Sequence, residues 1–322
     1  MGSGGDTVTA SVQLAVRPKP GRRRIGGSRW QRAENAAGYL FMTPWLIGLV
    51  AIVGGPFLVS LYLSFTKYSI LGSPKWIGLA NYVRMFTNDP RFLHALRVTF
   101  TYVVVSVPAV QVFSLALAVL LNRGIRGLSV YRAVFYIPSL IGGSVAIAIL
   151  WRFIFDTHGL VNNILATLGV QTQASWIGRP STALWTLIIL NIWQFGAPMI
   201  IYLAGLRQIP VDLYEAATVD GAGGFQKFIR ITLPMLSPVI LFNVLMNIVS
   251  AFQAFNTAYV VSNGTGGPAD STLFYTLYLY QTGFVNFDMG YAAALGWVLL
   301  LISAVFAAVL YGLSRRLVYY GD

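Results

Sequence analysis

Six long apolar segments alternate with shorter polar segments along the 322 residues of this chain. Each approaches or exceeds the roughly 20 residues that an α-helix needs to cross a hydrocarbon core about 30 Å thick. Pro44, Pro56 and Pro108 lie inside these segments, and membrane helices tolerate proline where neighbouring groups bond the freed carbonyls. We therefore predict membrane-spanning helices over residues 39–66, 98–121, 133–155, 183–206, 237–261 and 290–314.

The apolar segments are continuous rather than alternating, which decides between the two structures that can span a membrane. A β-barrel needs strands in which apolar and polar residues alternate, whereas residues 141–150 and 295–309 are apolar or small throughout. The composition agrees, because 56% of the residues are hydrophobic, 10% are charged and the mean hydropathy is +0.67. One soluble core of this length could not bury so much apolar surface. The sequence predicts an all-α integral membrane protein with six transmembrane helices.

A basic segment precedes the first apolar one. Residues 1–38 combine Gly, Ser and Pro with the basic residues Arg17, Lys19, Arg22, Arg23, Arg24, Arg29 and Arg32. Such a composition cannot form a core, so we expect a disordered tail followed by a membrane domain over 39–322. Basic residues next to a membrane span favour the cytoplasmic side and contact with membrane lipid over binding to nucleic acid. Because the predicted number of spans is even, both termini are expected in the cytoplasm.

A polar segment over residues 207–234 separates the fourth and fifth spans on the predicted cytoplasmic side. From Pro210 it reads PVDLYEAATVDGAGGFQKFIRITLP. Pro210 suits the first turn of a helix, where the helix dipole also favours the carboxylates of Asp212 and Glu215. Asp220-Gly221 ends this helix, because glycine adopts a positive φ at little cost. We predict two short helices, over 211–219 and 222–231, joined by a tight turn.

The spacing E-A-A-x3-G-x9-I-x-L-P within this segment resembles the signature loop of permease subunits of ATP-binding-cassette (ABC) importers. The resemblance implies a type I ABC importer permease fold, in which the loop 207–234 docks into a groove on a separate ATP-hydrolysing subunit. The positions that it assigns to ATPase coupling are Glu215, Ala216, Ala217, Asp220, Gly221, Phe225 and Pro234. The chain has no G-x-x-x-x-G-K-[ST] phosphate-binding run. ATP and Mg²⁺ are therefore expected on the partner ATPase subunits, with no cofactor in this chain.

Three further segments resemble the carbohydrate importers of this superfamily, of the maltose and glycerol-3-phosphate type. They are residues 78–82 (GLANY), 131–138 (YRAVFYIP) and 263–268 (NGTGGP). The resemblance covers nearly all of residues 39–322 and implies a second homologous permease, two ATP-binding subunits and an extracytoplasmic solute-binding protein as partners. It also implies residence in the cytoplasmic, or inner, membrane of a prokaryote. Because importers of other solutes share the loop motif, a non-sugar substrate stays open as an alternative.

Amide and hydroxyl side chains in and beside the fourth and fifth spans are candidates for contact with a transported sugar. Polar groups are costly in lipid unless they face protein or water. Amides offer both hydrogen-bond donors and acceptors, as sugar hydroxyls do. The candidates for the substrate pathway are Asn191, Gln194, Asn243, Asn247, Ser250 and Gln253. The same residue types often join membrane helices by hydrogen bonds, and the sequence leaves both interpretations open.

Ionisable residues do not lie where ion-coupled transport or catalysis would need them. None of the six predicted spans contains Asp, Glu, His or Lys, and Arg152 lies near the end of one, where it can snorkel. A secondary transporter, the less favoured alternative, usually carries such residues within the bilayer. His94, His158, Asp89 and Asp156 are isolated in outer loops, and the chain has no cysteine. We predict no catalytic or metal site, and a transport subunit rather than an enzyme.

Overall fold

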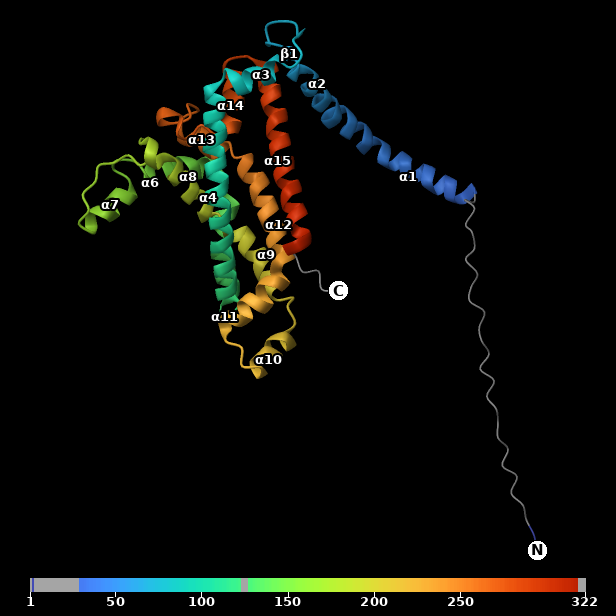
Figure 1. Ribbon diagram of the computed structural model, residues 1–322, viewed down its shortest axis with the longest axis vertical. Coiled ribbons are helices and arrows are strands. Elements are labelled where there is room, and N and C mark those ends of the chain that lie inside the picture. The colour runs from blue at the N-terminus through green and yellow to red at the C-terminus, as the bar shows by residue number, and fades with distance from the viewer. Residues whose placement is uncertain (1, 3–28, 123–126, 318–322) are drawn as a thin grey trace. The chain divides into compact units, whose positions relative to one another are not determined.

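The computed structural model describes residues 2, 29–122 and 127–317 (Figure 1), which divide into two units, before and after residue 57. The first unit contains helix α1 (Arg29–Gly48), the π-helical turn η1 (Leu49–Gly54) and the first residues of α2 (Gly55–Ser64). Helix α1 begins well before residue 38, because residues 29–37 contain neither Gly nor Pro. The end of the predicted disordered tail is therefore helical, and the rest of the tail lies outside the described residues.

The second unit is an assembly of helices with one small β-ladder. After α2 come β1 (Thr66–Lys67), β2 (Lys75–Trp76), α3 (Ala80–Thr87), α4 (Pro90–Leu121), α5 (Leu128–Ile141), α6 (Val145–Ile154), α7 (Leu160–Thr167), α8 (Pro180–Trp193), α9 (Gly196–Leu206), α10 (Val211–Val219), α11 (Gly224–Lys227), η2 (Phe228–Thr232), α12 (Leu233–Phe252), α13 (Asn256–Val261), η3 (Pro268–Asp270), α14 (Tyr275–Tyr280), η4 (Gln281–Val285) and α15 (Met289–Leu317). Strands β1 and β2 pair in antiparallel fashion. This short ladder, with one isolated bridge between Ser69 and Asp288, is the departure from the predicted all-α fold within the described ranges.

Five helical segments of the described residues are long and apolar enough to cross a membrane. They are Gly38–Ser64, Pro90–Leu121, Pro180–Leu206, Gly224–Val261 and Met289–Ser314. The remaining predicted span, 133–155, is formed by α5 and α6, and the helix direction bends by 97° between them. If this bent pair counts as one span, the described residues contain six spans. The bend falls at Gly142-Gly143-Ser144, where the Ser144 Oγ accepts a hydrogen bond from the Ile147 N (3.3 Å) and caps α6. The span is therefore broken rather than continuous.

Helix α4 is the central helix of the second unit and contacts α8, α9, α12 and α14. The Asp89 carboxylate caps its start by accepting a hydrogen bond from the Phe92 N (3.0 Å). Polar groups along α4 then bond its neighbours: the Tyr275 N donates to the Thr99 Oγ1 (2.8 Å), and the Ser114 Oγ donates to the Phe195 carbonyl (3.0 Å). Such interhelical bonds join helices where lipid supplies no hydrophobic driving force.

Two of the long apolar segments are also broken, at residues 194–195 between α8 and α9 and at 253–255 between α12 and α13. Side chains of other helices bond the backbone at both breaks. The Ser139 Oγ donates to the Gln194 carbonyl (2.8 Å) and accepts from the Ala197 N (2.9 Å). The Thr276 Oγ1 donates to the Ala254 carbonyl. Backbone that leaves a helix within a membrane needs such partners, so each break is a fixed part of the fold.

We predict that Gly196→Ala destabilises the protein by about 1–3 kcal/mol, because α5 and α9 touch at this glycine. A Cβ at residue 196 would lie 2.8 Å from the Tyr136 Cα and closer still to the Phe135 carbonyl oxygen. The apparent Tm of the purified protein in detergent should fall accordingly. Gly312→Ala is the matched control, since a Cβ there meets no atom within 4 Å. Equal Tm values for the two variants would contradict the observed contact.

Candidate functional site

The polar segment 207–234 folds into two short helical pieces with a tight turn between them. Helix α10 spans Val211–Val219, as the sequence predicts, with Pro210 as its N-cap and Asp212 in its first turn. The second piece begins at Gly224 rather than at residue 222, and it continues as the π-helical turn η2 from Phe228. The Gln226 Oε1 accepts a hydrogen bond from the Gly223 N (3.1 Å), which fixes this start.

Gly221 forms the turn with a φ of +76°, a conformation that costs side-chain-bearing residues free energy. The Ala222 N donates to the Ala217 carbonyl (2.8 Å) and the Gly221 N donates to the Thr218 carbonyl (3.1 Å). Both bonds satisfy carbonyl groups at the end of α10, as in other helices that end in a left-handed glycine. The turn is therefore determined by local backbone chemistry.

Two side-chain hydrogen bonds hold the two pieces at a fixed angle. The Lys227 Nζ donates to the Thr218 Oγ1 (2.6 Å), and the Tyr214 hydroxyl lies 2.9 Å from the Oγ1 of the buried Thr232. A cavity of about 250 Å³ lies behind this joint and is also lined by Val119 and Asn122 at the end of α4. We call these two bonds the joint of the loop. None of these four side chains could be identified from the sequence, because the bonded residues are 9 and 18 positions apart and lie on different pieces.

The predicted coupling residues lie mostly on the exposed side of the loop. Exposed residues are Glu215, Ala216, Asp220, Gly221 and Phe225, whereas Ala217 and Pro234 are half-buried. Phe225 is 76% exposed, and Val219, which the sequence analysis did not single out, is 89% exposed. Two large apolar side chains beside an exposed turn are typical of a surface that contacts another protein.

The six predicted pathway residues line two adjoining cavities at the helix breaks. One cavity of about 300 Å³ is lined by Asn191, Gln194, Ser250 and Gln253, among others. The second, of about 370 Å³, shares Asn191, Gln194 and Ser250 and adds Asn243 and Asn247. The structure therefore brings together side chains of α8, α12 and the residues that follow each helix. We call this group the polar cluster.

Several amides of the polar cluster lack partners within the described part of the chain. The Nδ2 atom of Asn191 is buried and donates no hydrogen bond, whereas the Asn243 side chain, which is 3% exposed, lies beside the Tyr202 hydroxyl. No side-chain hydrogen bond to another helix is found among the described residues for Asn247, Ser250 or Gln253. A buried donor without an acceptor is costly, so the Asn191 amide is an unsatisfied polar group at this helix break.

Other lining residues come from elements that the sequence analysis did not connect with the pathway. Ser139 of α5 lines the larger cavity, and Tyr102 of α4 and Asn256 of α13 line the smaller one. Gly142 lies against the cluster, since a Cβ there would approach the Gln194 Cδ to 2.5 Å. A glycine pair inside an apolar segment is the sequence signal that could have indicated this close approach.

Asp89 is not isolated, contrary to the expectation from the sequence. Its carboxylate accepts hydrogen bonds from the hydroxyls of Tyr278 and Tyr291. Burial by itself raises the pKa of Asp89, but the hydrogen bonds from both tyrosines hold that pKa below its ordinary value. The carboxylate thus fastens the start of α4 to α14 and α15 and takes no part in the polar cluster.

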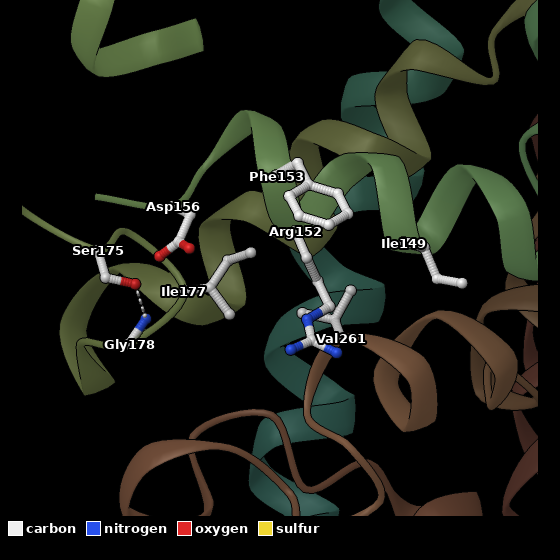
Figure 2. A pocket seen from close by; sticks show the side chains of 8 residues that line it. All are labelled: Ile149, Arg152, Phe153, Asp156, Ser175, Ile177, Gly178 and Val261. Carbon is white, nitrogen blue, oxygen red and sulfur yellow. Dashed lines mark hydrogen bonds between the residues drawn. The ribbon is translucent and has the colours of Figure 1, made fainter. Parts of the chain in front are cut away.

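Arg152 and Asp156 line a separate cavity of about 270 Å³ (Figure 2). Arg152 lies in the last turn of α6, and its Nη1 donates to the Asn263 Oδ1 (2.6 Å) in the turn after α13. In the same cavity the Ser175 Oγ accepts a hydrogen bond from the Gly178 N (3.0 Å), which Figure 2 marks with a dashed line. These contacts tie α6 to α13 and order the segment before α8. No group of three or more metal-ligating side chains occurs within the described ranges.

The amino-acid sequence is similar to a family model and to individual transport proteins. The family model described as "Binding-protein-dependent transport system inner membrane component" matches residues 87–319. The probable ABC transporter permease protein YesP of Bacillus subtilis (strain 168) is 48% identical over 293 residues, which cover 91% of this chain and 95% of that protein. The lactose transport system permease protein LacF of Rhizobium radiobacter is 35% identical over 294 residues, covering 90% and 97% of the two chains.

A solved structure shares the fold. In the crystal structure of a bacterial alginate ABC transporter in complex with an alginate pentasaccharide-bound periplasmic protein, one chain matches with a TM-score of 0.77 at 24% identity. The match covers 91% of this chain and 99% of that chain. The shared fold therefore extends over nearly the whole length of both chains.

We predict that Gly221→Ala weakens the turn of the loop by about 1–2 kcal/mol, because alanine at a positive φ is strained even where space is open. No atom lies within 4 Å of a Cβ at this position. Hydrogen exchange of the amides of Gly221 and Ala222 should therefore accelerate. In Gly223→Ala, the matched control, φ is −70° and the exchange rates should stay unchanged. Equal rates in both variants would show that backbone strain does not determine the turn.

Proposed function

The chain belongs to the family of binding-protein-dependent transport system inner membrane components, and on that premise we propose how it works as the permease subunit of a carbohydrate ABC importer. It is a multi-pass membrane protein with the type I importer permease fold. In our proposal both termini and the loop 207–234 lie in the cytoplasm, and ATP hydrolysis on partner subunits drives transport. The sugar crosses by alternating access of the polar cluster to the two sides of the membrane.

The exposed loop is the observation that carries the proposal. Val219 and Phe225, 89% and 76% exposed, flank the turn at Gly221 and would bury their apolar surface in a groove of an ATP-binding subunit. Glu215, on the same exposed side, would provide a charged contact at the rim. Two such subunits would hold ATP and Mg²⁺, since this chain has no phosphate-binding run.

The polar cluster suits a sugar. Its free amide and hydroxyl groups can donate to and accept from sugar hydroxyls, and aromatic Tyr102 and Phe255 line the same cavity, where a ring can stack on a sugar face. The names of LacF and of the probable starch degradation products permease AmyD of Thermoanaerobacterium thermosulfurigenes, which is 31% identical, support this substrate class. The lack of interhelical side-chain bonds at Asn247, Ser250 and Gln253 favours substrate contact over helix packing.

Two further partners complete the proposed complex. A second, homologous permease would complete the binding site, because the two cavities, of about 300 and 370 Å³, are small for an oligosaccharide. An extracytoplasmic solute-binding protein would deliver the sugar, and the structurally similar alginate transporter was crystallised in complex with a periplasmic protein that holds an alginate pentasaccharide. The discontinuous helices α8–α9 and α12–α13 would then provide the binding site, as broken helices do in other transporters.

We predict that Tyr214→Phe uncouples ATP hydrolysis from transport, because it removes one bond of the joint and keeps the aromatic ring. Reconstituted complexes should hydrolyse ATP at near the original rate but import several-fold less sugar per ATP. Simultaneous assay of ATPase activity and sugar uptake in proteoliposomes measures this ratio. Tyr311→Phe, at an exposed tyrosine of α15, is the control. If Tyr214→Phe imports as much sugar per ATP as the unaltered complex, the joint takes no part in coupling.

We also predict that Asn247→Leu and Gln253→Leu each lower sugar uptake on the order of tenfold, since each removes a hydrogen-bonding group from the polar cluster. The basal ATPase rate without binding protein should stay the same, because neither residue contacts the loop. Thr101→Leu removes a polar group from an exposed position of α4 outside both cavities and should leave uptake intact. Normal uptake in both amide variants would instead assign the polar cluster to helix packing.

A further inference from the structure

The hairpin over residues 66–76 carries two lysines that face each other. Antiparallel pairing places Lys67 directly opposite Lys75, so both side chains leave the same face of the ladder. Both are exposed, and neither belongs to the two ion pairs found within the described ranges, Arg84–Asp288 and Arg91–Asp270. Like charges in this position destabilise a ladder, and an anionic partner on that face would relieve the repulsion.

The base of this hairpin is held rigidly. The Asn81 Nδ2, from a side chain 5% exposed, donates to the carbonyls of Ser64 and Thr66 at 2.9 Å each. On the other side, the Gly290 N donates to the Tyr68 carbonyl (3.1 Å), and a Cβ at Gly290 would lie within 3.0 Å of the Tyr68 N. The hairpin is thus fixed between α3 and the start of α15. A preorganised surface loses little entropy when it binds a partner.

The hairpin also exposes large apolar side chains and adjoins a cavity. At its tip Leu71 is 91% exposed, and Trp76 in β2 is 63% exposed. Beside Lys67 lies a cavity of about 610 Å³, which is also lined by Arg84, Asn88, Asn286 and Asp288. Of the charged groups at the cavity and on the ladder, three are cations and one, Asp288, is a carboxylate that already bonds Arg84 (2.8 Å).

Backbone strain is present at the same cavity. Phe287 has a φ of +56°, an uncommon conformation for a bulky residue, and its half-exposed ring lines the cavity wall. Strained residues of this kind gather at functional sites, where the surrounding structure holds a side chain in position for a ligand. Phe287 adds an apolar surface next to the cations.

The hairpin lies at the opposite end of α4 from the loop 207–234 (Figure 1). It precedes the start of the 32-residue helix, whereas Val119 and Asn122 at the other end line the cavity behind the loop. A helix of this length extends for about 48 Å, which exceeds the hydrocarbon thickness of a membrane. If the loop is cytoplasmic, as the proposed function requires, the hairpin is extracytoplasmic.

We propose that the hairpin 66–76 and the adjoining cavity form a docking surface for an acidic patch on the extracytoplasmic solute-binding protein. This inference rests on the proposed function. Lys67 and Lys75 attract carboxylates of the patch, an acidic side chain enters the cavity toward Lys67 and Arg84, and Leu71 packs at the rim. Charged contacts of this type raise the rate of encounter and select the correct partner.

Charge reversal at Lys75 tests the docking surface. The complete importer, reconstituted in nanodiscs, is titrated with the solute-binding protein that copurifies with it. At low salt Lys75→Glu should bind roughly tenfold more weakly than the unaltered complex, and the difference should shrink at high salt. Arg179→Glu changes the charge by the same amount at another exposed outer position and should bind normally. Equal affinities of the two variants at low salt would overturn the inference while leaving the proposed function intact.

A second measurement identifies the occupant directly. A photo-crosslinking phenylalanine analogue replaces Leu71 in the complete complex, and the adduct is identified by mass spectrometry. An adduct with the solute-binding protein that disappears when Lys75→Glu is added supports the proposal. An adduct with lipid or with the second permease overturns it. An unaltered complex that recruits no binding protein at all would overturn both this inference and the proposed function.

Discussion

Backbone groups that leave a helix inside a membrane have no water to bond, and this constraint shapes the second unit of the chain. The helices are broken at residues 194–195 and 253–255, and hydroxyl groups of other helices bond the freed backbone at each break. At the first break, the hydroxyl of Ser139 in α5 donates a hydrogen bond to the Gln194 carbonyl, and the hydroxyl of Ser114 in α4 donates one to the Phe195 carbonyl. The positions of α4, α5 and α14 therefore depend on the breaks as much as the breaks depend on them.

The breaks also explain why polar side chains gather in one place. Irregular backbone at membrane depth is stable where it faces protein or a hydrated cavity, and Asn191, Gln194 and Gln253 lie at or near the two breaks. The amide residues could be found from the sequence, because polar residues in apolar segments are rare. The contribution of Ser139 could not, since it depends on the packing of α5 against α9, which brings this serine to the Gln194 carbonyl.

In the loop 207–234, too, some features depend on the local sequence and others depend on contacts between residues far apart in the chain. Pro210, Asp212 and Gly221 act within one or two turns of backbone, so the bounds of α10 and its terminal turn could be predicted. The start of the second piece at Gly224 and the joint between Tyr214 and Thr232 depend on tertiary contacts. Nothing in the local sequence distinguishes Thr232 from any other threonine at the edge of an apolar segment.

Helices α9 and α12 connect these two regions without interruption. Helix α9 runs from the break at 194–195 to the start of the loop, and α12 runs from the end of the loop to the break at 253–255. They pack closely together, because a Cβ at Gly205 would lie 2.9 Å from the Leu236 Cδ1. A close-packed pair of helices transmits a displacement rather than absorbing it. A movement of the loop would therefore reach both breaks together, and with them the polar cluster that lies between the breaks.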